Sequence, residues 1–193
     1  PLDHLDRTHT VGVQATRALD GLQYVSNDTL SFVPNGTPVT VERKLIETNT
    51  CITCHGELRE HGGSRRDVAL CILCHQPQAL DPDTGNTVNM STMIHKIHSG
   101  KHLPSVEAGT PYQIIGFNQA VHDYSTVAFP QDITRCETCH TGPQADAWKG
   151  KATRAVCTSC HDTTVFVSPA PMGMRLHSAG AFPDDALCFN CHG

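Results

Sequence analysis

Strict alternation of apolar and polar residues is confined to the start of the chain. Residues 8–16 and 38–43 each place valine or alanine at every second position. A period of two predicts short strands, and the FVPNGT segment at 32–37 predicts a turn between extended segments. We therefore expect an extended or β segment over residues 1–48, packed on a second domain over residues 49–193.

The clearest helical pattern is STMIHKIHSG, residues 91–100. Ser91 is a suitable N-cap and Gly100 a suitable residue just past the end, which predicts a helix of two to three turns. His95 and His98 are three residues apart, so both imidazoles project from the same face. The simplest explanation of such a pair is a polar helix face. A role as metal ligands is preferred only if the rest of the sequence indicates a cofactor for the histidines to bind.

The composition argues against an ordinary hydrophobic core. Aromatic residues make up 5% of the 193 residues and hydrophobic residues 38%, whereas glycine and proline number 15 and 12. Such a chain buries too little apolar side chain to order so many loop residues unaided. We therefore expect something other than side chains to fill the interior.

The charge and hydropathy of the chain argue against nucleic-acid binding and against a membrane-spanning segment. The formal net charge is −5 and no basic stripe is present, which argues against nucleic acid. No apolar run approaches the roughly 18–20 residues of a membrane span. The sequence starts at Pro1, with neither a methionine nor a signal peptide, so we expect a mature form or a piece of a longer protein.

All the cysteines fall into one motif, Cys-x-x-Cys-His, repeated five times. This is the attachment signature of c-type haem: two thiols three positions apart bind the porphyrin vinyl groups, and the histidine that follows ligates the iron. The predicted thioether cysteines are Cys51, Cys54, Cys71, Cys74, Cys136, Cys139, Cys157, Cys160, Cys188 and Cys191. The predicted proximal ligands are His55, His75, His140, His161 and His192.

Other uses of cysteine explain the pattern less well. Zinc sites usually take two Cys-x-x-Cys pairs per metal, so five pairs would leave one over. A disulfide scaffold gives no reason for a histidine after every second cysteine, and a thioredoxin motif occurs once in a βαβ setting. The sequence therefore predicts five c-type haems, attached outside the cytoplasm.

Eight histidines remain for the distal side of the irons, and five are needed if every haem has two histidine ligands. His61 is one candidate because Gly62 and Gly63, which follow it, allow close approach of the backbone to a porphyrin. His177 is the only remaining histidine between the fourth and fifth motifs.

The third and fourth motifs have no histidine between them, so their distal ligands must come from elsewhere in the chain. His95 and His98 then become ligands of two different haems. For the fifth position we take His9, at the start of the first strand, with His122 as the alternative. His102 is expected to cap or solvate the end of the helix at 91–100.

Several stretches together resemble the outer-surface multihaem cytochromes of metal-respiring bacteria, the decahaem OmcA/MtrC family. They are FVPNG, CITCHGELREHGGSRR, LCILCHQPQALDPDTGNTV, MIHKIHSGKHLP, YQIIGF, HDYSTVAFPQDITRCETCH and CFNCHG. The resemblance implies one pentahaem module with bis-histidine haems in van der Waals reach of one another, in a branched, staggered arrangement. Family members carry ten haems in two such modules, interleaved with β-barrel domains and often lipid-anchored, whereas this chain has five motifs.

We therefore predict a multihaem cytochrome c: mostly loop with short α-helices wrapped around five haems, plus a small N-terminal β element. Bis-histidine haems have no open position, which favours an electron carrier over an enzyme. The expected acceptors are extracellular metal oxides, flavin shuttles or partner cytochromes, with the protein at the outer-membrane surface, tethered through a larger protein, or elsewhere outside the cytoplasm. The alternatives are a homopolymeric filament (nanowire) of such subunits and a reductase with one open haem.

Overall fold

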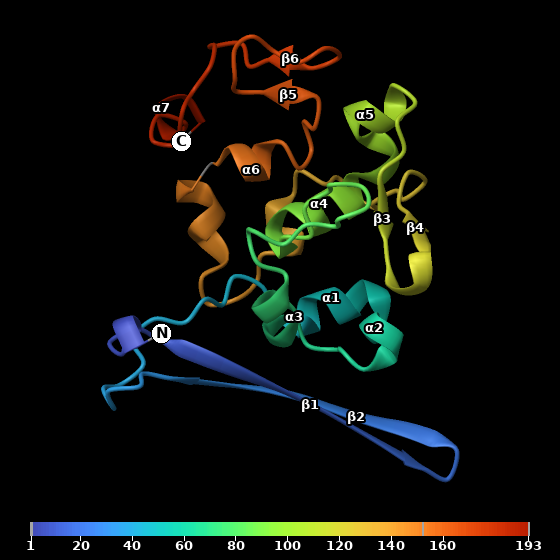
Figure 1. The fold of residues 1–193 in the computed structure, drawn as a ribbon, viewed down its shortest axis with the longest axis vertical. Helices are drawn as coiled ribbons and strands as arrows, with labels where there is room; N and C mark the ends of the chain where they lie inside the picture. Colours follow the sequence, from blue (N-terminus) through green and yellow to red (C-terminus); the bar gives the residue numbers. More distant parts are fainter. Residues whose placement is uncertain (1, 152, 193) are drawn as a thin grey trace. The chain divides into compact units, whose positions relative to one another are not determined.

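The computed structural model describes residues 2–151 and 153–192 (Figure 1). Most of this part of the chain is loop. The α-helices are α1 Thr48–His55, α2 Glu60–Gly63, α3 Val68–Cys74, α4 Met90–Ser99, α5 Pro104–Glu107, α6 Arg154–Cys157 and α7 Phe189–His192. The 3-10 turns are η1 Leu2–His4, η2 Gly100–His102, η3 Phe117–Gln119, η4 Cys136–Thr138 and η5 Ala145–Gly150. The strands are β1 His9–Leu19, β2 Leu22–Phe32, β3 Gln113–Ile115, β4 Val121–Asp123, β5 Thr164–Val165 and β6 Arg175–Leu176.

The longest regular element is the antiparallel hairpin of β1 and β2. Its turn is Asp20-Gly21, and both residues have positive φ (52° and 77°), as tight hairpin turns require. The strand predicted at 8–16 is confirmed and continues to Leu19. The strand predicted at 38–43 is wrong: β1 pairs with β2, and residues 38–43 form no regular structure. The predicted turn at 32–37 is present, but it follows the hairpin instead of joining two strands.

One face of the hairpin packs on α3. Gly12 faces this helix, and a Cβ at that position would lie 2.5 Å and 2.6 Å from the Cδ1 atoms of Leu70 and Leu73. Asn27, opposite Gln14, donates to the Ser64 carbonyl (3.0 Å) and accepts from the backbone N–H of Arg66 (2.6 Å). Figure 1 shows α1–α3 along one side of the hairpin.

The chain forms two compact units. The first contains the residues up to Cys74 together with Cys136–Asp146, and the second contains His75–Arg135 together with the residues from Ala147 onward. In sequence the division falls inside the second Cys-x-x-Cys-His motif. The predicted boundary at residue 48 separates the segment without such motifs from the rest, and it stays a prediction.

Apolar side chains form almost no core in the described part of the chain. The buried ones are Val33, Val68, Leu103 and Tyr112. Among the described helices, none has the length and apolar character that a membrane span requires. A short-helix, loop-rich fold with a small β element is as predicted, and its few buried apolar side chains suit a protein that covers large cofactors.

Candidate haem-binding sites

Each Cys-x-x-Cys-His motif lies on a helical turn. The first lies on α1, and the second lies on α3 and ends one residue after it. The third begins at η4, the fourth spans the end of α6 and the turn after it, and the fifth begins in the turn just before α7 and continues on that helix. In the third and fourth motifs the histidine N–H donates to the carbonyl of the first cysteine, His140 to Cys136 (2.9 Å) and His161 to Cys157 (3.0 Å). Residues three and four apart share a helix face, so the two thiols and the histidine lie together. The side chain of His192 lies outside the described part of the structure.

The first and third motifs lie side by side in the first unit. The hydroxyl groups of Thr50 and Thr141 hydrogen-bond to each other. The Lys44 N–H donates to the Gln144 side chain (3.0 Å), and the Gln144 N–H donates back to the Lys44 carbonyl (3.1 Å). Burial raises the pKa of the Cys51 thiol, and the neighbouring thiol of the third motif adds to the shift. Two motifs 85 positions apart in sequence therefore meet here (136 − 51).

The fourth and fifth motifs form a corresponding pair in the second unit. Arg154, the first residue of α6, donates through its backbone N–H (3.1 Å) and its Nε (2.7 Å) to the Asp185 carboxylate. Its Nη1 donates to the Phe182 carbonyl (3.0 Å). Burial raises the pKa of the Cys157 thiol, with a further contribution from Cys188. One arginine therefore connects the segments before both motifs.

Helix α4 is held against the fourth motif at three positions. Ser99 Oγ lies 3.3 Å from the Cys160 sulfur, and Thr92 donates to the carbonyl of Ala155 in α6 (3.5 Å). Between them, Lys96 Nζ lies 3.1 Å from a carboxylate oxygen of Asp162, the residue after the fourth proximal histidine. Their side chains are only 15% and 4% exposed, so this is a largely buried ion pair.

The N-terminal end of α4 differs from the prediction, and the C-terminal end agrees with it. The helix begins at Met90, with Asn89 as N-cap and no side-chain capping bond, so the prediction of Ser91 as N-cap is wrong. Gly100 ends the helix, as predicted, with φ 41°. A Cβ at Gly100 would lie 2.3 Å from the Val127 carbonyl oxygen, so the position requires glycine both for its backbone conformation and for this close approach.

Three predicted iron ligands have their ring protons placed as haem ligation requires. His95 Nδ1 donates to the Ser91 carbonyl, His98 Nδ1 to the Ile94 carbonyl (2.9 Å) and His75 Nδ1 to the Val88 carbonyl (2.7 Å). A carbonyl only accepts, so Nδ1 carries the proton and Nε2 carries the lone pair that binds a metal. Burial also lowers the pKa of His95, which favours the neutral, ligating form.

In His9 and His177 the hydrogen bonds place the ring proton on the other nitrogen, Nε2. His9 Nε2 donates to the His4 carbonyl (3.0 Å). In His177, Nδ1 accepts from the Ala179 N–H (3.3 Å), and the ring stacks on Phe166 with centroids 4.9 Å apart. In both rings the proton therefore lies on Nε2. Ligation through Nε2 would require a change of tautomer.

The remaining predicted ligands occupy less regular positions. His61 has a left-handed backbone (φ 51°), and the two glycines after it also have positive φ. This conformation costs a non-glycine residue roughly 1–2 kcal/mol, and such strain gathers at functional positions. His55 ends α1, and His122 lies exposed on β4 opposite Ile114.

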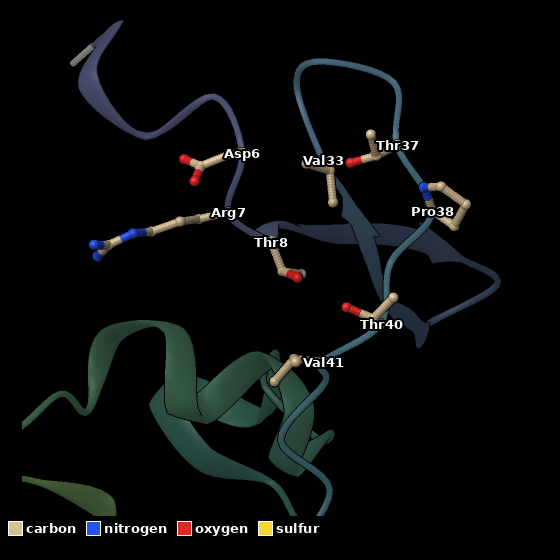
Figure 2. A pocket seen from close by; sticks show the side chains of 8 residues that line it. All are labelled: Asp6, Arg7, Thr8, Val33, Thr37, Pro38, Thr40 and Val41. Carbon is tan, nitrogen blue, oxygen red and sulfur yellow. The ribbon is translucent and has the colours of Figure 1, made fainter.

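A separate pocket of about 490 Å³ lies beside the base of the hairpin (Figure 2). Its lining residues are Asp6, Arg7, Thr8, Val33, Thr37, Pro38, Thr40 and Val41. None of them is a cysteine or a histidine, so this pocket is not a haem-attachment site.

The donor set fits haem c better than a bare metal ion. None of the ten cysteines forms a disulfide, and each motif offers two of them with one histidine. Within residues 2–151 and 153–192, no three His, Cys, Asp or Glu side chains converge as a metal-ion site requires. The near absence of an apolar core points to the same large cofactor.

Comparison with known proteins decides the family. The sequence model of the outer membrane cytochromes described as "MtrC/MtrF-like, domains II/IV" matches residues 43–193. The chain belongs to this family. As an MtrC/MtrF-like domain it is 26% identical over 198 residues to the multihaem cytochrome MtrC of Shewanella baltica (strain OS185), covering 98% of this chain and 25% of that protein.

Two solved structures show the same fold. The outer membrane decahaem cytochrome OmcA aligns with a TM-score of 0.67 and 29% identity, over 81% of this chain and 24% of OmcA. The structure of MtrC from Shewanella baltica OS185 aligns with a TM-score of 0.63 and 26% identity, over 97% and 27% of the two chains. The MtrC/MtrF-like chain thus spans about a quarter of these relatives. The family resemblance and the fold class inferred from sequence are confirmed.

Proposed function

We propose that the chain is an electron-transfer module that carries five c-type haems, one on each Cys-x-x-Cys-His motif. The observation that carries this proposal is that every motif occupies a helical turn, in a polypeptide that has almost no apolar core of its own. The ten cysteines supply the thioethers. The histidine of each motif supplies the proximal iron ligand: His55, His75, His140, His161 and His192.

The distal ligands in this proposal are histidines from outside the motifs. His95 and His98 have the strongest support, because α4 lies against the fourth motif and both rings carry their proton on Nδ1. His61 is supported by its strained backbone. His177 and His9 complete the set, with His122 as the alternative to His9.

Haem supplies one-electron chemistry when bound, and the chain determines how the haems are ligated and grouped. Two histidines per iron leave no coordination position for a substrate, and they favour lower reduction potentials than histidine–methionine ligation. The first motif lies beside the third and the fourth beside the fifth, which brings cofactors close within each unit. These features suit an electron carrier rather than an enzyme.

We place this module in electron transfer at the outer-membrane surface, towards metal oxides, flavin shuttles or partner cytochromes. The support is membership of an outer membrane cytochrome family and the likeness to OmcA and MtrC. Because the chain spans about a quarter of those proteins, it would act as one segment of a longer path of haems.

The test is a haem count combined with the iron spin state. Mass spectrometry of the denatured protein should show the polypeptide plus five covalent haems, and low-temperature EPR of the oxidised protein should show only low-spin iron. A smaller count would refute the five-haem proposal. A high-spin haem at every protein concentration would indicate an open, reductase-type site, whereas one that becomes low-spin on concentrating would indicate a ligand from a neighbouring copy, as in a filament.

A further inference from the structure

The hairpin has an apolar face that no described part of its unit covers. Directly opposite residues of an antiparallel pair share a face, so the face away from α3 follows from the strand register. Its apolar side chains are 40% to 68% exposed: Val11, Val13, Leu19, Leu22, Tyr24, Leu30 and Phe32. Contiguous exposed apolar patches of several hundred Å² mark interaction surfaces. We call this patch the outer hairpin face.

The thioether-forming cysteines of this unit lie away from the outer hairpin face, and of the proposed haem ligands only His9, in its first row, belongs to it. The face contains no cysteine, and α3, which carries the second pair of cysteines, packs on the opposite face through Leu70 and Leu73. The cysteines therefore place no cofactor over the apolar rows beyond the first one.

The outer hairpin face is arranged in six cross-strand rows that suit stacking on a second copy. From base to tip they are His9/Phe32, Val11/Leu30, Val13/Asp28, Ala15/Ser26, Arg17/Tyr24 and Leu19/Leu22. The row Ala15/Ser26 is small, with a charged row on each side of it and apolar rows beyond. A two-fold axis through this row reverses the strands of the second copy and leaves only the His9/Phe32 row without a counterpart. The row of Asp28 then meets the row of Arg17 from the other copy, and Val11/Leu30 meets Leu19/Leu22.

We propose that two copies of this chain associate through their outer hairpin faces, stacked antiparallel about the Ala15/Ser26 row. The charges are self-complementary in this register, since each copy supplies one arginine and one aspartate to two equivalent ion pairs. The exposed fractions of the six apolar side chains in the paired rows correspond to roughly 600 Å² per copy, at the lower end of the about 600–1,000 Å² per partner of a standard interface. This inference does not depend on the proposed electron-transfer function.

The first test measures the oligomeric state of the haem-loaded chain by sedimentation equilibrium at concentrations up to about 100 µM. Interfaces of about this area have a Kd in the micromolar range or lower, so this range should populate the dimer. The wild-type chain should be a dimer. Leu30→Asp, which places a charge opposite the apolar Leu19/Leu22 row of the other copy, should raise the dimer Kd at least about thirtyfold. Leu80→Asp is the matched control, because Leu80 is similarly exposed (60%) but lies outside the hairpin, and it should leave the Kd unchanged.

A charge exchange tests the register itself. Arg17→Asp or Asp28→Arg alone should weaken the dimer, because like charges then face each other between copies. An equimolar mixture of the two variants should associate more tightly than either variant alone, since opposite charges meet again only in the mixed dimer. A repair of charge pairing within one hairpin could not produce this result.

Three results would overturn the proposal. They are a wild-type chain that is monomeric throughout the concentration range, a Leu30→Asp variant that dimerises normally, and a mixture that associates no better than the separate variants. In the first case the outer hairpin face would be covered by another segment of a longer chain or by a different protein. In the other two, copies would meet elsewhere or in another register.

Discussion

The buried ion pair between α4 and the fourth motif allows the sharpest stability prediction. Lys96 Nζ and Asp162 lie 3.1 Å apart with side chains 15% and 4% exposed, and their Coulomb attraction is about 5 kcal/mol at an effective dielectric constant near 20. Desolvation offsets much of this. Removing one partner leaves the other charge buried, which typically costs about 3–5 kcal/mol.

The loss of unfolding free energy in Lys96→Met should lie at the lower end of that range, about 3 kcal/mol. Asp162 keeps two other donors, the backbone N–H of Ser105 (3.0 Å) and its hydroxyl group (2.6 Å), so its carboxylate is not left alone. Asp162→Asn should be similarly damaging, because Lys96 then retains chiefly the Tyr112 ring, 4.7 Å from Nζ. A loss of this size is a large part of the free energy of unfolding of a domain.

The assay is urea unfolding of the haem-loaded protein, followed by far-UV circular dichroism, for a double-mutant cycle. The double variant Lys96→Met/Asp162→Asn should lose at least about 2 kcal/mol less than the sum of the single variants, within the range measured for contacting residues. Lys101→Met, at an exposed position just after α4, is the control and should cost less than about 0.5 kcal/mol. Additive losses, or a Lys96→Met cost in the range of a surface pair, below about 1 kcal/mol, would refute the reasoning.

Three further predictions concern the end of α4, acid stability and iron ligation. Gly100→Ala should lower the unfolding midpoint more than Gly85→Ala in thermal scans, because both positions have positive φ but only at Gly100 would the Cβ meet a backbone oxygen, at 2.3 Å; equal losses would show that the contact relaxes. Hydrogen bonds from Arg154 lower the pKa of Asp185, chiefly the bond from its backbone N–H and next the bond from its guanidinium group. The stability it provides is complete above its unfolded pKa of about 3.9 and is lost as pH falls through the lower folded pKa. The midpoint of urea unfolding should therefore fall more steeply in this acid range for the wild type than for Asp185→Asn, and parallel curves would contradict this linkage. His98→Ala should convert one haem to high spin by EPR, whereas His102→Ala, at an exposed position next to the same helix end, should not; no difference between the two would remove His98 from the ligand set.

The sequence was most informative where the chemistry requires a fixed local spacing. The Cys-x-x-Cys-His motifs and the pair His95 and His98 need only a helical turn to bring their groups together, and the structure places them on such turns. The contacts between positions far apart in the sequence could not be predicted in this way. Ser99 and Cys160 are 61 positions apart, and Lys96 meets Asp162 across a similar interval, so no local pattern reports these pairings.

The hairpin shows how a pattern can mislead. The alternation at 38–43 predicted a strand, but a strand also needs a partner, and that segment has none. The true partner, β2, has its alternation of apolar and polar residues interrupted by Ser26 and Asp28, so this pattern does not predict it. The signal that identifies it is Asp20-Gly21 between Leu19 and Leu22, a dipeptide whose backbone preference suits a two-residue hairpin turn.

The scarcity of buried apolar side chains has a consequence for how the protein is made. A polypeptide whose described core consists of Val33, Val68, Leu103 and Tyr112 gains too little from collapse to offset its conformational entropy. The unmodified chain should therefore stay open during maturation, with its thiols accessible. With haems attached as proposed, attachment would need only the five residues of each motif, and tertiary structure would form as successive haems are joined. Maturation and folding of this protein would be a single process.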